Sequence, residues 1–373
     1  NSKPFEKIKM FLSTSEISSR LISDLRLGLP IILNDVEQFF LVAAIETLYS
    51  EKLEKINGIT KNLKFEIAIT NRRAKVLKAR IYNGSVTRLS VKEHISVQLL
   101  HAIADPSKDL DYPFKGPFHS ERDGNFNVAS VSLSLCKKAR LLPASILIKI
   151  PKSVREKLVS SQISVSDIKD LKFKNDDTNF LPTLSSAQLP IAGQQNINLT
   201  VFREVTDLIE HYAIVFGNPK ATQPALTRVH SACFTGDLLG SEKCDCGEQF
   251  SVSMAKMKNE GTGILLYLNQ EGRGIGLANK MRAYHLQNIG FDTVDANHRL
   301  GFEDDERDLE IAAKILKSLG VSSVNLMTNN PKKIELLTTN GITVKERVPL
   351  IASINPNNEN YLKTKAKKSG HLF

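Results

Sequence analysis

The chain has 373 residues, of which 41% are hydrophobic and 24% are charged, and it carries a net charge of +10 at pH 7. This composition is typical of globular proteins, and the length allows two domains with separate cores. No run of about 18 apolar residues and no basic-then-apolar leader occurs, so we expect a cytoplasmic protein that does not enter a membrane. The charge predicts anionic partners, but the sequence lacks a zinc-finger Cys/His pattern and an RNA-recognition aromatic motif, so we expect no nucleic acid among them.

The first half alternates strand-like and helix-like segments. Residues 30–33 are a short apolar strand candidate, residues 40–53 have helical spacing, and residues 144–150 have the composition of a buried strand. Residues 171–199 are mainly polar and contain two prolines, which indicates a connector. The sequence therefore predicts a first domain over 1–172, a linker over 173–196 and a second domain over 197–373.

The second half alternates more regularly. Residues 263–268 predict a strand that leads into a glycine-rich loop, and residues 277–287 predict an amphipathic helix closed by Gly290. We further expect a helix over 308–318, a strand over 324–327, and a last helix that begins at Pro331 with Asn330 as its cap. This order of elements predicts two mixed α/β domains of the α+β class.

Three of the four cysteines, Cys233, Cys244 and Cys246, are close together in the sequence. A Cys-x-Cys pair cannot readily form its own disulfide, but its thiolates can bind one metal ion, with Cys233 as a third ligand. Three ligands leave a position for a reactive water, whereas a structural site would be closed by His230 or a distant residue; the spacing alone leaves both open. The fourth cysteine, Cys136, lies in an apolar helical stretch and is most simply a core residue.

The segments around these cysteines form an ordered series of motifs. The series consists of Arg228-Val-His-Ser-Ala-Cys233, Gly247-Glu-Gln249, Leu268-Asn-Gln-Glu-Gly-Arg-Gly-Ile-Gly-Leu277, Asp292-Thr-Val-Asp-Ala-Asn297, Gly301-Phe-Glu-Asp-Asp-Glu-Arg-Asp308 and Thr328-Asn-Asn-Pro-Lys-Lys333. In residue type, order and spacing, the second half of the chain closely resembles GTP cyclohydrolase II.

This resemblance implies a reaction and its cofactors. The reaction is the zinc-dependent hydrolytic opening of the guanine imidazole ring of GTP, the first step of riboflavin biosynthesis. It releases formate and pyrophosphate and gives 2,5-diamino-6-(5-phosphoribosylamino)pyrimidin-4-one. The resemblance further implies one Zn2+ per cyclohydrolase domain, bound by Cys233, Cys244 and Cys246 with water in the fourth position, Mg2+ bound with the GTP phosphates, and a homodimer. Thiolate-rich sites favour zinc over magnesium, which agrees with this assignment.

The resemblance also assigns roles to single residues. It implies that Asp305 is a proton acceptor, that Arg307 is a nucleophile toward the α-phosphate, and that Tyr284 lies near the metal-bound water. Because a guanidinium is almost always protonated, we favour phosphate binding for Arg307. Glu271 suits the ring N–H and amino group of the base, and Arg273 and Lys333 suit the phosphates. The GTP-binding residues that it implies are Arg228, Val229, His230, Ser231, Ala232, Gln249, Glu271, Gly272, Arg273, Thr293, Thr328 and Lys333.

Simpler interpretations of several of these residues stay open at this point. Residues 303–308 have the charge pattern of an ordinary helix start, because acidic residues are common there. Thr328 and Lys333 are also typical of a capped helix that follows a strand. Tyr284 lies in a predicted helix and could simply be buried in the core.

The first half resembles a different family, 3,4-dihydroxy-2-butanone-4-phosphate synthase, with a less complete match over residues 26–35, 41–44, 87–90, 103–106 and 135–143. The acidic, magnesium-binding loop of that family is reduced here to Asn34-Asp-Val-Glu-Gln-Phe-Phe40, and its Gly-His-Thr-Glu motif corresponds to Asn127-Val-Ala-Ser130. Magnesium needs hard oxygen ligands and enolisation needs a base. We therefore hypothesise that this domain keeps the fold but has lost the synthase reaction, with Asp35, Glu37 and His119 as surface groups.

One departure from the cyclohydrolase pattern leaves alternative functions open. Ala232 stands where the family has glutamate, and the loss of an acceptor beside a zinc ligand weakens nucleotide binding unless a water replaces it. A catalytically impaired GTP-binding regulatory module is therefore one alternative. A dinucleotide-dependent oxidoreductase is another, although residues 272–277 depart from Gly-x-Gly-x-x-Gly because Leu277 ends the series. A basic nucleic-acid binder is the third.

Overall fold

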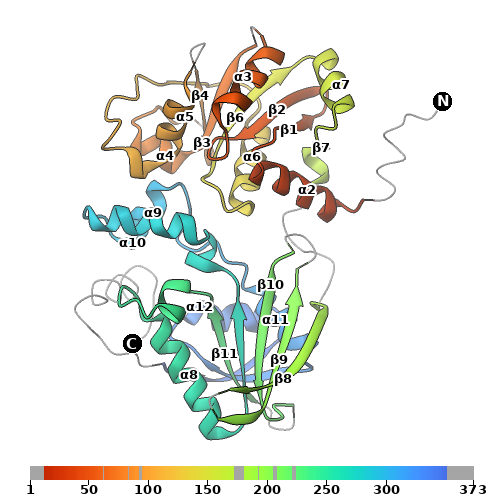
Figure 1. Cartoon of the computed structure of the whole chain (residues 1–373), viewed down its shortest axis with the longest axis vertical. Coiled ribbons are helices and arrows are strands. Elements are labelled where there is room, and N and C mark those ends of the chain that lie inside the picture. The colour runs from red at the N-terminus through yellow and green to blue at the C-terminus, as the bar shows by residue number, and fades with distance from the viewer. Residues whose placement is uncertain are drawn as a thin grey trace, which may run out of the picture. The chain divides into compact units, whose positions relative to one another are not determined.

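The computed structural model of the chain describes residues 12–61, 63–82, 84–91, 95–171, 180–191, 193–204, 208–220 and 224–350. It divides into two compact units (Figure 1). The first unit comprises residues 1–175, 278–291 and 295–304, and the second comprises residues 176–277, 292–294 and 305–373. A segment from the second half of the sequence therefore belongs to the first unit, which the prediction of continuous domains did not anticipate.

The first unit is built on a seven-stranded sheet with the strand order β5-β4-β3-β6-β2-β1-β7. Neighbouring strands are antiparallel except for β1 and β7, which are parallel. The strands are β1 (Ile31–Asp35), β2 (Gln38–Ala44), β3 (Phe65–Thr70), β4 (Val86–Ser90), β5 (His119–Ser120), β6 (Ala144–Ile150) and β7 (Val165–Asp167).

The core of the first unit lies between this sheet and the helices α2 and α6, which contact each other and the sheet. Helix α2 begins with a capping box, in which Ser13 and Glu16 bond each other's backbone N–H groups, and it buries Leu21 and Leu25. The helices before residue 175 are α2 (Thr14–Arg26), α3 (Ser50–Ile59), α4 (Asn71–Val76), α5 (Val97–Ala104), η1 (Pro106–Lys108), α6 (Phe126–Lys138), α7 (Lys152–Ser160) and η2 (Ile168–Asp170).

Two of the three elements predicted for the first half are confirmed, and one is partly wrong. The strands expected over 30–33 and 144–150 are β1 and β6. The helix expected over 40–53 is wrong for its first half, because residues 40–44 belong to β2 and only residues 50–59 form a helix. Strand β2 is a continuous apolar run buried between β1 and β6, and such a run has no period that separates strand from helix.

The second unit is built on another seven-stranded sheet, with the order β14-β13-β11-β12-β10-β9-β8. Strands β14, β13, β11 and β12 are parallel, whereas β12, β10, β9 and β8 pair antiparallel. The strands are β8 (Thr183–Ile191), β9 (Gln194–Arg203), β10 (Glu210–Phe216), β11 (Ala225–Ser231), β12 (Gly263–Leu268), β13 (Ser323–Met327) and β14 (Thr343–Val348).

Strand β8 lies inside the segment that the sequence predicts as a connector. Eight of its nine residues are exposed, so both faces of this edge strand meet solvent and carry polar side chains. Because a strand without a buried face shows no alternation of apolar residues, its sequence is indistinguishable from a polar linker. Residues 173–179, which open the predicted linker, lie outside the described residues.

The three helices that the sequence predicts for the second half are confirmed, whereas α8 and α10 are not among the predicted elements. The helix expected over 277–287 is α9, the one over 308–318 is α11, and the last helix begins at Pro331 with the Asn330 side chain accepting from Lys332 N–H. Strands expected over 263–268 and 324–327 are β12 and β13. The helices after residue 175 are η3 (Phe234–Leu238), α8 (Cys246–Glu260), η4 (Glu271–Gly274), α9 (Leu277–Asn288), α10 (Thr293–Arg299), α11 (Glu310–Ser318) and α12 (Pro331–Thr339).

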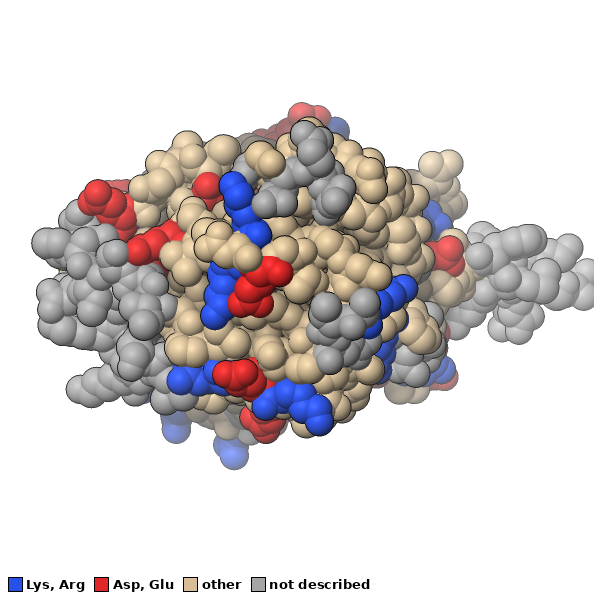
Figure 2. Space-filling model, turned by 90° about the horizontal axis from the view of Figure 1, so that it is seen from below, with Lys and Arg blue, Asp and Glu red and all other residues tan. Residues whose placement is uncertain are grey.

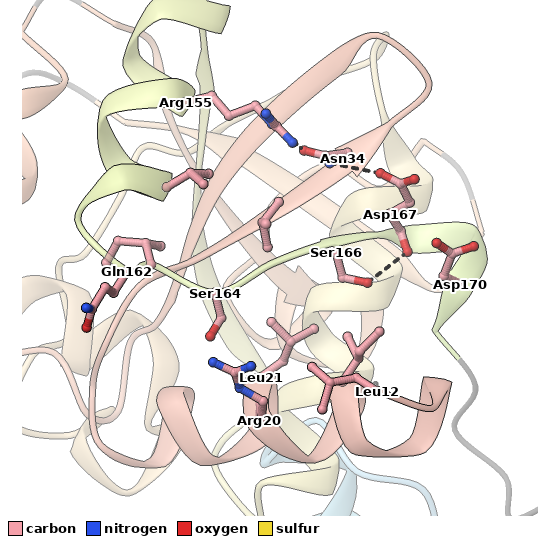
Figure 3. Close-up of a pocket in the computed structure, with 14 residues that line it drawn as sticks. Leu12, Arg20, Leu21, Asn34, Arg155, Gln162, Ser164, Ser166, Asp167 and Asp170 are labelled. Carbon is pink, nitrogen blue, oxygen red and sulfur yellow. Dashed lines mark hydrogen bonds between the residues drawn. The ribbon is translucent and has the colours of Figure 1, made fainter. Parts of the chain in front are cut away.

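A cavity of about 600 Å³ lies at the β7 edge of the first unit (Figure 3). Asn34 crosses one side of it, accepting from Arg155 Nε at 3.3 Å and donating to Asp167 Oδ1 at 2.8 Å. Arg20 and Leu21 of helix α2 form the opposite wall. The predicted cyclohydrolase residues do not line this cavity.

The charged side chains are mixed on the face of the molecule seen from below in Figure 2. Lysine and arginine side chains stand among aspartates and glutamates there, so the net positive charge does not form one continuous patch on the described part of this face. None of the helices in the described part of the chain combines the length and apolar composition that a membrane crossing needs.

Candidate metal and nucleotide site

Many of the predicted site residues lie where three parallel strands of the second unit end. Strands β11, β12 and β13 run in the same direction, and Ser231 pairs with Leu268 at the ends of β11 and β12. Because the carboxyl ends of parallel strands meet at one edge of a sheet, the loops that follow them lie together. These loops carry the first cysteine after β11, the glycine-rich segment after β12 and Thr328 after β13.

The three cysteine thiols form a compact group. Cys233 follows β11 and precedes η3, Cys244 lies in the turn after it, and Cys246 is the first residue of α8. Their sulfur atoms lie within 4.8 Å of one another, and the Cys233 and Cys244 sulfurs are 3.6 Å apart. In the described part of the chain, no histidine, aspartate or glutamate joins this group as a fourth ligand.

Two glycines allow the thiols to approach each other. A Cβ atom at Gly236 would lie 3.0 Å from the Cys244 sulfur and 3.1 Å from the Cys233 sulfur. A Cβ atom at Gly247 would lie 2.2 Å from the Gly236 carbonyl oxygen. The backbone of η3 therefore packs directly against the thiols, and three soft sulfur donors in such a group fit a zinc ion.

The protonation of the thiols depends on their mutual contacts. The Cys233 thiol, which hydrogen-bonds Cys244, raises the pKa of Cys244 above its ordinary value. A bound cation has the opposite effect, because it stabilises thiolates. The free Cys136 in the first unit is fully buried, and burial raises its pKa to about 12, so it is an inert core thiol as expected.

Asp237, which the sequence analysis did not single out, organises the loop of the first cysteine. Its carboxylate accepts from the Cys233 backbone N–H at 2.9 Å and from the Tyr267 hydroxyl at 2.9 Å. It also lies 3.0 Å from His230 Nε2. The only signal of this role in the sequence is an aspartate four residues after a metal-spaced cysteine.

His230 belongs to this carboxylate network. Burial lowers its pKa despite the contact with Asp237, so the ring is neutral at pH 7 and donates from Nε2. It stacks on Tyr267 and meets the edge of Phe250. Its Nδ1 atom is buried and has no hydrogen-bond partner among the described residues.

Arg228 is a buried cation beside the thiol group. Its guanidinium donates to Met327 O at 3.0 Å and to Gln249 Oε1 at 2.7 Å, and Gln249 donates in turn to Asp245. Burial lowers the pKa of Arg228 to about 10, so it stays charged at neutral pH. Its Nε atom has no hydrogen-bond partner in the described part of the chain.

The glycine-rich loop after β12 adopts a backbone that favours glycine. Gly272 and Arg273 both have left-handed conformations, with φ of 63° and 61°. The Glu271 carboxylate is buried and accepts from Phe234 N–H at 2.6 Å and from Gly272 N–H at 3.0 Å. This pairing ties the loop to the helix η3 that follows Cys233.

The same loop contacts the acidic segment before α11. A Cβ atom at Gly274 would lie 2.7 Å from the Glu306 carbonyl, and Glu306 N–H donates to the Arg273 carbonyl at 3.0 Å. The close approach requires glycine at this position, where φ is +94°. The loop and the segment that carries Arg307 are therefore one packed structure.

Asp305 and Arg307 form a forked ion pair. Arg307 Nε and Nη2 donate to the two Asp305 oxygens at 2.8 and 2.5 Å, and Nη1 donates to Ser231 Oγ at 3.1 Å. Burial raises the pKa of Asp305, but the hydrogen bond and charge of Arg307 outweigh it and hold the pKa below its ordinary value. Asp305 is therefore ionised at neutral pH and is a weak base in this arrangement.

The loop after β13 is well ordered by its own contacts. Thr328 is buried and accepts from the backbone N–H of Asn330, the residue that caps α12, at 3.0 Å. Lys333 in the first turn of α12 is buried and donates to the Val229 carbonyl at 2.7 Å. Thr328 is thus bonded to the residue that caps α12, and Lys333 contacts the backbone of β11.

The other predicted residues are found in different surroundings. Ala232 is half-buried, and its N–H donates to the Leu268 carbonyl at 2.7 Å. Thr293 is the first residue of α10 and is half-buried. Tyr284 lies on the part of α9 that belongs to the first unit, where the Lys280 ammonium lies 5.5 Å from its ring centroid. Its place beside the metal-bound water stays a prediction.

The residues of the first half that correspond to the synthase motifs have ordinary structural contacts. Glu37 and His119 are exposed, as expected. Asp35 is half-buried rather than at the surface, because it accepts a hydrogen bond from the Asn125 side chain. Asn34 is buried and bonded to Arg155 and Asp167.

The chain matches known proteins over both halves. Residues 183–349 match the family model of GTP cyclohydrolase II. A GTP cyclohydrolase-2 from Azospirillum brasilense is 43% identical over 313 residues, which cover 82% of this chain and 81% of that relative.

The chain belongs to the GTP cyclohydrolase II family.

Because the family model begins at residue 183, a match over 313 residues must also include much of the first half. A GTP cyclohydrolase-2 from Escherichia coli O9:H4 is 56% identical over 172 residues, which cover 46% of this chain and 88% of that relative. All three clustered cysteines, Arg228, Glu271 and the Asp305–Arg307 pair lie within the part that the cyclohydrolase II model matches.

Solved structures are similar at a lower level. A two-domain 3,4-dihydroxy-2-butanone 4-phosphate synthase from A. baumannii is 16% identical, covers 90% of this chain and 99% of its own, and has a TM-score of 0.31. The corresponding synthase from Candida albicans is 14% identical, covers 41% of this chain and 93% of its own, and also has a TM-score of 0.31.

Proposed function

We propose that this cyclohydrolase II family member opens the imidazole ring of GTP by hydrolysis at a zinc ion held by Cys233, Cys244 and Cys246. The products are formate, pyrophosphate and 2,5-diamino-6-(5-phosphoribosylamino)pyrimidin-4-one, and the reaction is the first step of riboflavin biosynthesis. The observation that carries this proposal is the group of three thiols within 4.8 Å, which no fourth described ligand closes. A zinc ion held by these thiolates would supply Lewis acidity to the hydrolysis.

The chain's own residues bind and orient the base. Glu271 is buried, its two oxygens accept the backbone N–H groups of Phe234 and Gly272, and its carboxylate suits the ring N–H and amino group of guanine. A ligand without those donors leaves a buried carboxylate unpaired, so this residue discriminates guanine from other bases. Gln249 is already oriented by Arg228 and Asp245.

Several cations are available for the triphosphate. Arg228 and Lys333 are buried and charged, and Arg307 presents a planar fork that can exchange its contact with Ser231 for a phosphate oxygen. Asp305 holds the guanidinium of Arg307 in place through two hydrogen bonds. We therefore assign phosphate binding to Arg307 and its positioning to Asp305, with Mg2+ neutralising the remaining phosphate charge.

We further propose that Tyr284 acts near the metal site, that the chain forms a homodimer and that it works in the cytoplasm. None of the four cysteines, all of which lie in the described part of the chain, forms a disulfide, which suits a reducing compartment. We also propose that the first half no longer catalyses synthase chemistry. In the segment that corresponds to the acidic loop, Asn34 is bonded to Arg155 and Asp167, and Asp35 is bonded to Asn125.

The test of the proposed reaction is formate release from GTP by the purified chain with zinc and magnesium present. We expect release by the parent chain, its loss in Cys244→Ser, and its retention in Cys136→Ser, whose thiol lies in the core of the first unit. Equal release by Cys244→Ser and the parent would refute the role of the thiol group. A separate assay with ribulose 5-phosphate tests the first half, where robust conversion would overturn the proposed loss.

A second candidate is a GTP-binding regulatory module without turnover. Ala232 favours it, because a methyl group replaces the family's carboxylate beside Cys233. Stoichiometric binding of GTP without formate release would support this candidate. Ala232→Glu would then be expected to restore turnover.

A further inference from the structure

The segment 278–304 lies within the part that the cyclohydrolase II model matches, yet most of it belongs to the first unit. It comprises most of α9 and α10 and the turn after α10. Residues 271–276 of the glycine-rich loop precede it, and Asp305 follows it directly. The two ends of the segment are therefore joined, through the chain, to groups that the proposed function assigns to GTP.

Arg282 on α9 is the centre of one set of contacts inside the first unit. It donates from Nη2 to Glu46 Oε1 at 2.9 Å and from Nε to Asp105 Oδ2 at 3.1 Å. Its third nitrogen, Nη1, donates to Asn279 Oδ1 at 2.6 Å. Glu46 and Asp105 are 17% and 10% exposed, so both carboxylates are partly desolvated and their pairing with one guanidinium is specific.

The neighbouring residues fix this arrangement further. Asn279 is fully buried and donates from Nδ2 to the Arg140 carbonyl at 3.1 Å. The second oxygen of Glu46 accepts from the Leu142 backbone N–H at 2.6 Å. The carboxylate that holds Arg282 is thereby held itself by the backbone before β6.

A second set of contacts holds the end of the segment. Arg72 pairs with Glu303, with its Nη2 atom 2.5 Å from Oε2. Gly301 has φ of +88°, and a Cβ atom there would lie 2.8 Å from both Pro143 and the Thr70 hydroxyl. The ion pair is largely exposed and contributes little alone, whereas the close approach to Thr70 and Pro143 requires glycine at position 301.

We propose that the first half of the chain, in place of its own chemistry, serves as a positioning scaffold for the cyclohydrolase site, with Arg282 as the principal positioning residue. By holding the segment 278–304, it fixes Tyr284 and, through the chain, the ends of the loops that carry Arg273 and Asp305. This proposal rests on the proposed function for its catalytic readout.

The test compares Arg282→Gln and Arg282→Lys with the control Lys55→Gln in the full-length, zinc-loaded chain. The control removes an ion pair between Lys55 and Glu51, both of which are exposed. Hydrogen exchange is measured on peptides that cover residues 278–304, together with kcat and KM for formate release. Zinc content and the number of GTP-analogue binding sites report the fraction of intact sites.

We expect faster exchange in residues 278–304 of Arg282→Gln and a fall in kcat of roughly tenfold to a hundredfold, as displaced catalytic groups produce. The number of zinc and analogue sites should stay unchanged, so that fewer active molecules cannot explain the fall. Arg282→Lys, which keeps the charge but not the fork, should recover part of kcat. The control should match the parent in every measurement.

Two outcomes would overturn the proposal that the first half is a positioning scaffold. One is unchanged exchange over 278–304 in Arg282→Gln, and the other is faster exchange with unchanged kcat. The exchange measurement does not depend on turnover, so a parent chain that releases no formate would refute the proposed function while leaving the anchoring of the segment to be decided by exchange alone.

Discussion

The carboxylate of Asp237 accepts the backbone N–H of Cys233 at 2.9 Å. This single contact fixes the start of η3 and therefore the direction in which the first thiol of the metal group points. The same carboxylate is held by Tyr267 and lies beside His230, so its own position is fixed from two strands. Groups that orient metal ligands commonly affect metal affinity almost as much as the ligands do.

We predict that Asp237→Asn lowers zinc affinity by roughly tenfold to a hundredfold, because the amide is a weaker acceptor for the Cys233 N–H. Competition with a chromophoric chelator measures the affinity. Tyr267→Phe is the matched control, because it removes a donor to Asp237 but leaves the contact between Asp237 and Cys233. Its zinc affinity should fall less than that of Asp237→Asn. Equal affinity in Asp237→Asn and the parent would show that the contact has no such role.

Gly236→Ala should lower zinc affinity by at least about tenfold, because the added methyl group enters the space between the thiols. Zinc per chain, measured by elemental analysis after dialysis, reports the effect. Gly58→Ala is the control: Gly58 lies inside α3 with open space around it, and alanine there should stabilise the helix by about 1 kcal/mol without changing zinc content. Normal zinc content in Gly236→Ala would argue against the packing described.

Arg307→Lys should lower kcat/KM for GTP by roughly tenfold to a hundredfold, the effect of losing about 1.5–3 kcal/mol from a charge-assisted contact. A lysine keeps the charge but cannot form the two-point contact with Asp305 and a phosphate oxygen. Steady-state kinetics of formate release measure it, and zinc content should not change. Full activity in the lysine variant would indicate that only charge is needed.

The pH dependence separates two roles for Asp305. Its pKa lies below the ordinary 3.8 because Arg307 outweighs the effect of burial, so it is ionised throughout pH 5.5 to 8.5 and cannot produce an acidic limb in that range. Asp305→Asn should therefore lower kcat/KM at every pH without moving the acidic limb of the profile. Disappearance of that limb in the variant would instead identify Asp305 as the titrating base.

The sequence is sufficient to predict much of the site but not its supporting contacts. The spacing of Cys233, Cys244 and Cys246 predicts a thiol group because metal ligands must converge within a few ångströms. The role of Asp237 depends on how η3 folds back toward β11 and β12, which spacing does not encode. In the same way, the hydrogen bond from Arg282 to Glu46 joins residues that are 236 positions apart, and no local sequence pattern predicts it.

The fold shows the same limit. Strands β6 and β12 are predictable because each is an apolar run with clear ends. The prediction is wrong for β2 because a strand that is mostly buried shows no alternation of apolar and polar residues. Strand β8 is absent from the prediction because a strand that is mostly exposed shows no such alternation either. Both errors arise where burial is the same on the two faces, so that only the pairing partners define the element.

The most direct test of the account is formate release from GTP by one preparation, measured as purified, after removal of zinc with a chelator, and after zinc is added back. The account predicts release by the purified chain, its loss on chelation and its return with zinc, in proportion to zinc bound per chain. Undiminished release by the zinc-free chain would contradict it.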